Sequence, residues 1–220
     1  QEAVEAGRLL KTEKILFDVC YTSYLKRAIQ TLNLVLQEMD CEWLPVYKDW
    51  KLNERHYGGL QGLNKSETAK EYGEEQVKIW RRSYDVRPPF LEIEDDRNPG
   101  KLVQYRDVPK EKLPLAESLK DTAERVNFYF DSAIAVQLKK EKNVLVTAHG
   151  NSLRALIMRL EHLTPEQILD LNLPTGIPIV YELNQELEVE QRKYLGDPVW
   201  IKEKINQVAA QGRKKEADYG

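Results

Sequence analysis

The sequence has few cysteines and histidines, no long apolar run and almost no net charge. With Cys20 and Cys41 as its only cysteines, the 220-residue chain cannot be a disulfide scaffold or hold a four-cysteine zinc site. No run approaches the roughly 18 apolar residues of a membrane-spanning helix, so we expect no membrane role. The formal net charge of −3 argues against a general nucleic-acid binder. Three histidines, His56, His149 and His162, argue against a histidine-rich metal site, and we expect no metal.

The residues that are present have the composition of a globular protein, with 41% apolar and 31% charged residues. This length suits one domain, which we expect to span residues 1–220. Apolar, β-rich segments predict strands within residues 15–22, 43–52, 143–148 and 177–183. Because a strand leads directly into a helix twice, the pattern predicts an α/β fold. Its sheet is expected to be mostly parallel and flanked by helices on both faces.

Helical periodicity predicts helices over residues 2–11, 24–39, 66–84, 118–140 and 153–163, and another in the tail after residue 196. Thr22 and Ser23 are expected to cap the second of these helices. Capping pairs at Ser118–Asp121 and Thr164–Gln167 mark two further helix starts. Residues 84–117 are rich in Pro, Asp and Arg and predict a long surface excursion.

Ligands bind at the carboxyl ends of the strands in parallel sheets, so residues 22–27 and 148–154 are expected to share one rim. His149 follows a predicted strand and precedes Gly150, Asn151 and a helix start. The N–H groups of that start favour an anion, and the imidazole could donate to a phosphate or accept its transfer. The alternative is a histidine that only satisfies a backbone group near the sheet.

Two further segments offer groups for the same chemistry. Arg27 lies about one turn into the helix after the first strand, and its guanidinium suits a phosphate clamp. The alternative is an ordinary solvated helix charge. Glu54, Arg55, His56 and Tyr57 precede a pair of glycines and supply groups for acid–base chemistry and anion binding. The alternative there is a polar surface turn.

Other candidates are ambiguous from sequence alone. Arg81 and Arg82 could clamp a phosphate or complement a helix C-terminal dipole, and Lys65 is equally open. Neither cysteine has a neighbouring histidine, so we expect no thiol nucleophile. Together the candidates are mainly cations and hydrogen-bond donors with one carboxylate and one histidine. This set predicts phosphoryl transfer on a small, highly anionic substrate, driven by positioning and charge stabilisation.

Several ordered stretches resemble the cofactor-dependent phosphoglycerate mutases of the histidine phosphatase superfamily. They are YTSYLKRAIQT, LNERHYGGLQGLNKSETAKEYGEEQVKIWRRSYDVRPP, LPLAESLKDTAERV and VTAHGNSLRALI, followed by PTGIPIVYEL. They cover most of residues 15–183, and stretches of this length are far more specific than a lone HGNS.

The resemblance implies a histidine-phosphatase-like fold and an isomerase of glycolysis and gluconeogenesis. Such an enzyme interconverts 3-phosphoglycerate and 2-phosphoglycerate through a phosphohistidine primed by 2,3-bisphosphoglycerate. It further implies that Glu54 exchanges a proton with the substrate hydroxyl, that His149 stabilises the transferring phosphoryl group and that Arg27 binds phosphate. The substrate-contacting positions it implies are Arg55, His56, Tyr57, Lys65, Arg81, Arg82, Gly150 and Asn151.

The family's phosphorylated histidine lies in an Arg-His-Gly motif after a first strand that is central in the sheet. This sequence contains no such motif, because Arg55-His56-Tyr57 belongs to the stretch around Glu54. We therefore expect a chain that starts inside the domain at Gln1, lacks the first strand and is inactive as a mutase by itself. Neighbouring strands would then expose a row of backbone groups that another segment or a second chain could cover.

Two alternatives stay open. One is a bisphosphoglycerate mutase or phosphatase activity in the same site, and the other is a non-catalytic relic that only binds phosphorylated acids. The resemblance also implies a homodimer or homotetramer in the cytoplasm, which fits two cysteines without a disulfide role. The expected partners are small phosphorylated three-carbon acids, with no nucleic acid and no membrane.

Overall fold

A three-stranded parallel sheet with the order β2–β1–β3 lies at the centre of the fold. The computed structural model describes residues 1–63 and 72–217. β1 (Val19–Thr22) pairs in parallel with β2 (Val46–Lys48) on one side and with β3 (Val144–Thr147) on the other. The carboxyl ends of these strands therefore meet at one edge, as the strand–helix pattern predicts.

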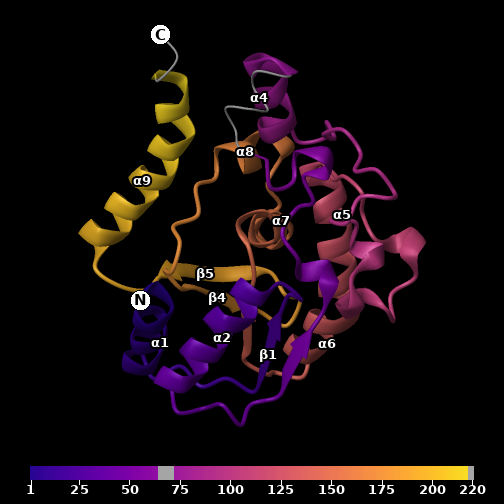
Figure 1. Cartoon of the computed structure of the whole chain (residues 1–220). Coiled ribbons are helices and arrows are strands. Elements are labelled where there is room, and N and C mark those ends of the chain that lie inside the picture. The colour runs from indigo at the N-terminus through magenta and orange to yellow at the C-terminus, as the bar shows by residue number, and fades with distance from the viewer. Residues whose placement is uncertain (64–71, 218–220) are drawn as a thin grey trace.

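Helices cover both faces of this sheet, which confirms the predicted α/β fold (Figure 1). α1 and α2 lie together on one side, and α5, α6 and α7 lie on the other. The helices are α1 (Glu2–Thr12), α2 (Lys26–Glu38), α4 (Glu74–Arg82), α5 (Leu119–Tyr129), α6 (Ala135–Leu138), α7 (Gly150–Leu160), α8 (Pro165–Asp170) and α9 (Pro198–Ala217).

Alternate residues of β1 enter different parts of the core, because successive side chains of a strand point to opposite faces. Val19 and Tyr21 pack with residues of α5 and α7, such as Val126 and Leu156. Cys20 packs instead with Leu32 of α2 and its neighbours. β1 is thus buried on both faces, as its near-continuous apolar sequence predicts.

A second, two-stranded antiparallel sheet pairs β4 (Ile179–Leu183) with β5 (Val189–Tyr194). β4 was predicted from the sequence, but β5 was not, because its centre carries the charged and polar run Glu190–Lys193. Within the described residues, β3 and β4 each pair with a single strand. The additional central strand implied by the family resemblance stays a prediction.

The start of α2 differs from the prediction. The helix begins at Lys26 with Leu25 in the N-cap position, and no side chain caps it. Ser23 does not cap because its hydroxyl accepts from the backbone N–H of Leu25, before the helix begins, and contacts His149. The predicted capping boxes at Ser118–Asp121 and Thr164–Gln167 are both confirmed.

The excursion between α4 and α5 is held by short 3₁₀ turns rather than by long elements. These turns are η3 (Pro99–Lys101), η4 (Val103–Tyr105) and η5 (Lys110–Lys112). Two similar turns, η1 (Trp50–Leu52) and η2 (Gly58–Leu60), flank the loop that contains Glu54. Trp50, Tyr105 and Leu113 form a small core that joins the excursion to this loop. A π-helical segment, η6 (Phe130–Ile134), links α5 to α6.

Candidate active site

The predicted rim at the carboxyl ends of β1 and β3 is present. Nε of Arg27, on the first turn of α2, donates to Nδ1 of His149 over 3.1 Å. Oγ of Ser23 lies 2.7 Å from the other ring nitrogen, Nε2. His149 and Ser23 are buried, whereas Arg27 remains exposed. Groups 122 and 126 residues apart in the sequence therefore meet as the parallel-strand rule predicts.

Glu54 is held at the N-terminus of α7. Its Oε1 accepts from the backbone N–H of Asn151 over 3.2 Å and from the N–H of Arg55 over 2.8 Å. Its other carboxylate oxygen lies next to Gly150, where an added Cβ would stand 3.9 Å away. The helix start was predicted to attract an anion, and within the protein that anion is the carboxylate of Glu54.

Tyr57 and Asn151 extend this contact. Nδ2 of Asn151 donates to the Tyr57 hydroxyl over 3.1 Å, so the loop around Glu54 is bound to α7 at two points. The guanidinium of Arg55 lies 5.2 Å from the centre of the Tyr57 ring, within cation–π range. The candidates Glu54, Tyr57 and Asn151 are therefore brought together around the residues that follow His149.

A cavity of about 220 Å³ opens beside these residues. Five of its lining residues are predicted site residues, namely Arg27, Glu54, Arg55, His56 and Tyr57. The less polar part of its lining comes mainly from the excursion, with Pro99, Tyr105, Leu113 and Pro114. The cavity lining thus combines cationic and hydrogen-bonding groups with largely apolar ones.

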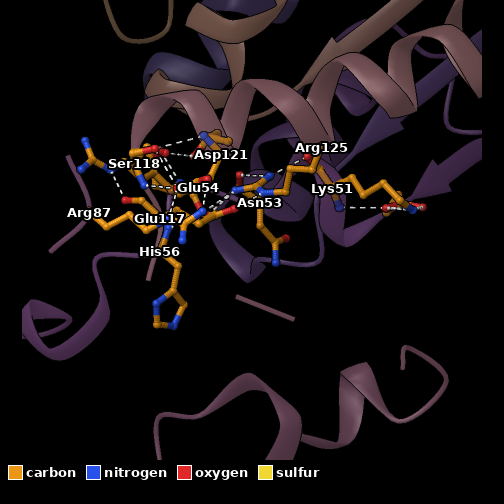
Figure 2. Close-up of polar contacts among 12 residues, drawn as sticks. Lys51, Asn53, Glu54, His56, Arg87, Glu117, Ser118, Asp121 and Arg125 are labelled. Carbon is orange, nitrogen blue, oxygen red and sulfur yellow. Dashed lines mark hydrogen bonds and ion pairs between the residues drawn. The ribbon is translucent and has the colours of Figure 1, made fainter. Parts of the chain in front are cut away.

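The sequence analysis missed two residues that hold the loop in place, Glu117 and Arg125 (Figure 2). They form a buried ion pair, with Nε of Arg125 2.6 Å from Oε1 of Glu117. The guanidinium of Arg125 also donates to the carbonyl oxygens of Lys51, Asn53 and Glu54. One side chain of α5 therefore binds three carbonyl groups of the loop that presents the predicted proton-transfer group.

Glu117 binds the same loop from its other side. Its Oε2 accepts from the N–H of His56 over 2.8 Å, and its carbonyl accepts from Nε of Arg55 over 2.7 Å. Its own N–H donates to the carbonyl of His56. Figure 2 shows that the side chains of Asn53 and His56 point away from this cluster, toward the side on which both line the cavity.

Burial shapes the charge of the site. It lowers the pKa of His149 to about 3, and the nearby cations Arg27 and Arg125 act in the same direction. The pKa of His56 is also lowered, chiefly by burial, and its Nδ1 accepts from the N–H of Gly58. Both imidazoles are therefore neutral near pH 7, so the positive charge of the site resides on arginines.

One more arginine close to Glu54 and Tyr57 was not among the predicted site residues. Burial lowers the pKa of Arg154, on α7, although the charges of Tyr57 and Glu54 oppose the shift. Nε of Arg154 donates to the carbonyl of Leu171. Its place on the rim follows from the predicted segment 148–154. The partial burial of its side chain could not be predicted from the sequence.

Three predicted residues are not tested by the geometry. Lys65 lies outside the described residues, and the side chains of Arg81 and Arg82 are likewise outside the described part of α4. The backbone of α4 does reach the site, because the carbonyl of Trp80 accepts from Nη2 of Arg55 over 2.6 Å.

Across the described residues, no group of three His, Cys, Asp or Glu side chains is placed to hold a metal ion. None of the helices in that part of the chain is sufficiently long and apolar to cross a bilayer.

The model of the histidine phosphatase superfamily (branch 1) matches residues 1–96 and 91–190 of this chain. The chain belongs to the histidine phosphatase superfamily. Two relatives are named 2,3-bisphosphoglycerate-dependent phosphoglycerate mutase. The one from Treponema denticola is 58% identical over 215 residues, which span 98% of this chain and 87% of the relative. The one from Lachnoclostridium phytofermentans is 62% identical over 212 residues, which span 96% and 85%.

Solved structures of the superfamily share the fold at low sequence identity. The α-ribazole phosphatase of Shigella flexneri superposes with a TM-score of 0.60 at 20% identity, covering 88% of this chain and 81% of that one. The mycobacterial glucosyl-3-phosphoglycerate phosphatase gives a TM-score of 0.58 at 19% identity, covering 88% and 82%. These similarities support the fold, whereas the relatives near 60% identity bear on the activity.

Proposed function

We propose that this site binds phosphorylated three-carbon acids and serves the interconversion of 3-phosphoglycerate and 2-phosphoglycerate, an isomerase reaction of glycolysis and gluconeogenesis. The observation that carries the proposal is the convergence of Arg27 and Glu54 on one cavity, with His149 hydrogen-bonded to Arg27. The printed names of both relatives support the same reaction.

Each group has a role suited to its chemistry. Glu54 gives a proton to, and takes one from, the substrate hydroxyl, because it is the carboxylate of the cavity that reaches the start of α7. Arg27 supplies a planar cation for the phosphoryl oxygens, and the neutral His149 adds a hydrogen-bonding ring beside it. Arg55, His56, Tyr57, Lys65, Arg81, Arg82, Gly150 and Asn151 are proposed to contact substrate.

The proposed phosphoryl donor is 2,3-bisphosphoglycerate, with no metal. The residues present fit such a ligand, since a cavity edged by arginine and amide donors suits phosphate and carboxylate groups. None of the three histidines lies in the Arg-His-Gly motif that carries the phosphoryl group in the family. We therefore propose that the 220-residue chain by itself neither turns over nor becomes phosphorylated.

Calorimetric titration of the chain with 3-phosphoglycerate tests the binding site. We expect one site per chain, and we expect Arg27→Met to weaken it by roughly ten- to a hundredfold because a charge-assisted hydrogen bond is lost. Arg8→Met is the matched control, since Arg8 is exposed and pairs with Glu38, at the other end of α2 from Arg27. No binding, or equal binding by the two variants, would overturn the proposal.

Radiolabelled 2,3-bisphosphoglycerate tests the predicted lack of turnover. We expect no label on histidine and no release of inorganic phosphate. Label on histidine would refute the inactivity of the chain, and phosphate release would favour the bisphosphoglycerate phosphatase alternative. The encoded sequence upstream of Gln1 separates an enzyme, with an apolar strand and Arg-His-Gly, from a binding relic that begins with a start codon there.

We further propose that the protein self-associates and works in the cytoplasm. Among the described residues β2 is one of the two outer strands of its sheet, and Tyr47 on it and the nearby Trp43 are exposed. Such an edge suits pairing with a second copy. Both cysteines are free, which fits a reducing compartment. Sedimentation velocity of the chain, compared with Tyr47→Lys, tests the self-association.

A further inference from the structure

Both ring nitrogens of His149 are committed to protein groups. Nδ1 lies 3.1 Å from Nε of Arg27, and Nε2 lies 2.7 Å from Oγ of Ser23. Ser23 is fully buried and His149 is 6% exposed, so water does not compete for the contact between them. The ring is therefore held from two sides by residues of the segment between β1 and α2.

The chemistry of the two partners fixes where the ring hydrogen lies. A guanidinium has no acceptor, so Nε–H of Arg27 must donate and Nδ1 must accept with its lone pair. A neutral imidazole carries one hydrogen, which then lies on Nε2 and is donated to Oγ of Ser23. That oxygen also accepts the N–H of Leu25, so both of its lone pairs are used.

We infer that Ser23 is a positioning residue that, together with Arg27, holds His149 in the tautomer with its hydrogen on Nε2. Ser23 keeps the ring oriented by accepting that hydrogen, and Arg27 excludes a hydrogen from Nδ1. Ser23 was not among the predicted site residues, because a serine after a strand is more simply explained as a helix cap.

This arrangement deepens the proposed function and rests on it for its catalytic meaning. The charged groups that face the ring are Arg27 from α2 and Arg125 from α5, and both oppose protonation. Glu54 is bound instead to the backbone of Asn151 and Arg55. His149 therefore enters the proposed site as a neutral ring whose orientation is fixed by Ser23 and Arg27, and the exchange of protons is left to Glu54.

Nitrogen-15 NMR of the unliganded chain tests the inference. Correlation spectra distinguish a protonated from an unprotonated ring nitrogen, and His56→Gln and His162→Gln assign the signals of the three histidines. For His149 we expect hydrogen on Nε2 alone between about pH 6 and 8, with slow exchange against water because it is buried and bonded.

Ser23 and Ser152 are both buried, so variants of the two form a matched pair that measures how much Ser23 contributes to holding the His149 ring. Ser152 also bonds to His149, but through the backbone N–H and carbonyl rather than the ring. We expect Ser23→Ala to speed exchange of the Nε2 hydrogen by roughly three- to tenfold, the value of one neutral hydrogen bond, and Ser152→Ala to leave it unchanged. Arg27→Met should allow hydrogen to appear on Nδ1.

Hydrogen on Nδ1 in the wild-type chain, a freely titrating His149 ring, or equal effects of the two serine variants would overturn the inference. The NMR experiment needs no ligand, so its outcome is independent of the proposed function. A chain that fails to bind 3-phosphoglycerate but shows the expected spectrum would reject the function and keep the role of Ser23.

Discussion

Oε1 of Glu54 lies 3.2 Å from the backbone nitrogen of Asn151, in the first turn of the helix that follows His149. This contact joins a loop after η1 to the start of α7, segments 97 residues apart. Because the helix start stabilises a negative charge, the carboxylate is held as an acceptor at the edge of the cavity. It also means that a bound anion must approach a side chain of the same sign.

Glu54→Gln tests this relationship. Glutamine keeps an acceptor oxygen for Asn151 and Arg55 but removes one negative charge from the cavity. We expect the affinity for 3-phosphoglycerate to rise by roughly three- to tenfold in calorimetric titration, because a like charge is lost. Glu13→Gln, an exposed position paired with Lys193, should change nothing. Unchanged or weaker binding by Glu54→Gln would contradict this placement of the carboxylate.

Arg125→Met tests the buried ion pair under the loop. The Arg125 and Glu117 side chains are only 9% and 4% exposed, so removing one leaves the other charge buried. We expect the free energy of unfolding in urea to fall by about 3–5 kcal/mol. Arg8→Met, which breaks an exposed pair, should cost less than about 1 kcal/mol. Equal costs would show that Arg125 does not organise the loop.

The lowered pKa of His149 predicts a pH dependence of stability. Above pH 6.5 the ring is neutral in the folded and unfolded chains, so it contributes no slope. Below pH 6.5 the His149 ring becomes protonated in the unfolded chain, whereas in the folded chain it stays neutral down to about pH 3. The free energy of unfolding therefore falls as the pH is lowered across that window. His149→Gln should flatten this slope in urea titrations at successive pH values.

His56 contributes a slope of the same sign, because its pKa is also lowered by burial. The comparison of His149→Gln with His56→Gln therefore separates the two histidines. His162→Gln is the control, since that ring is exposed and contacts Glu188. If the pH slope of the unfolding free energy persists in His149→Gln and disappears in His56→Gln, the effect belongs to His56 and the prediction for His149 is wrong.

Gly58→Ala tests the turn that follows Tyr57. Gly58 has φ of +57°, and an added Cβ would stand 2.1 Å from the carbonyl oxygen of Pro89. Left-handed backbone strain alone costs about 1–2 kcal/mol. We expect Gly58→Ala to lower the free energy of unfolding by clearly more than this, because the backbone at Pro89 must also move. Gly62→Ala carries only the strain, with φ of +76° and no atom within 4 Å. Similar unfolding midpoints for the two variants would contradict the close approach.

The rim could be predicted from sequence because it follows from local order. Two strands that each lead into a helix place His149 and Arg27 at the same edge of a parallel sheet, whatever else the chain does. The capping boxes of α5 and α8 were likewise predictable, since their partners are three residues apart.

The support of the loop could not be predicted in this way. Arg125 reaches carbonyl groups 71 to 74 residues away, and a charged residue on a predicted helix carries no sign of such a partner. The prediction that Ser23 caps a helix was wrong for a related reason. Its position fits a helix cap, but a ring from 126 residues away takes the hydroxyl. Long-range partners, rather than local propensity, decided these positions.

The N–H of Leu91 donates to the carbonyl of Leu115 over 3.0 Å and closes the base of the excursion. The residues between them contact the loop around Glu54 through the small core of Trp50, Tyr105 and Leu113. Glu117, just beyond them, binds that loop directly together with Arg125. Insertions or deletions within residues 92–114 would therefore reshape the less polar part of the cavity lining, while Glu117 and Arg125 still bind the loop that presents Glu54. Changes in the length of this excursion would therefore alter the size of the ligand that the cavity admits, while the contacts that hold Glu54 remain.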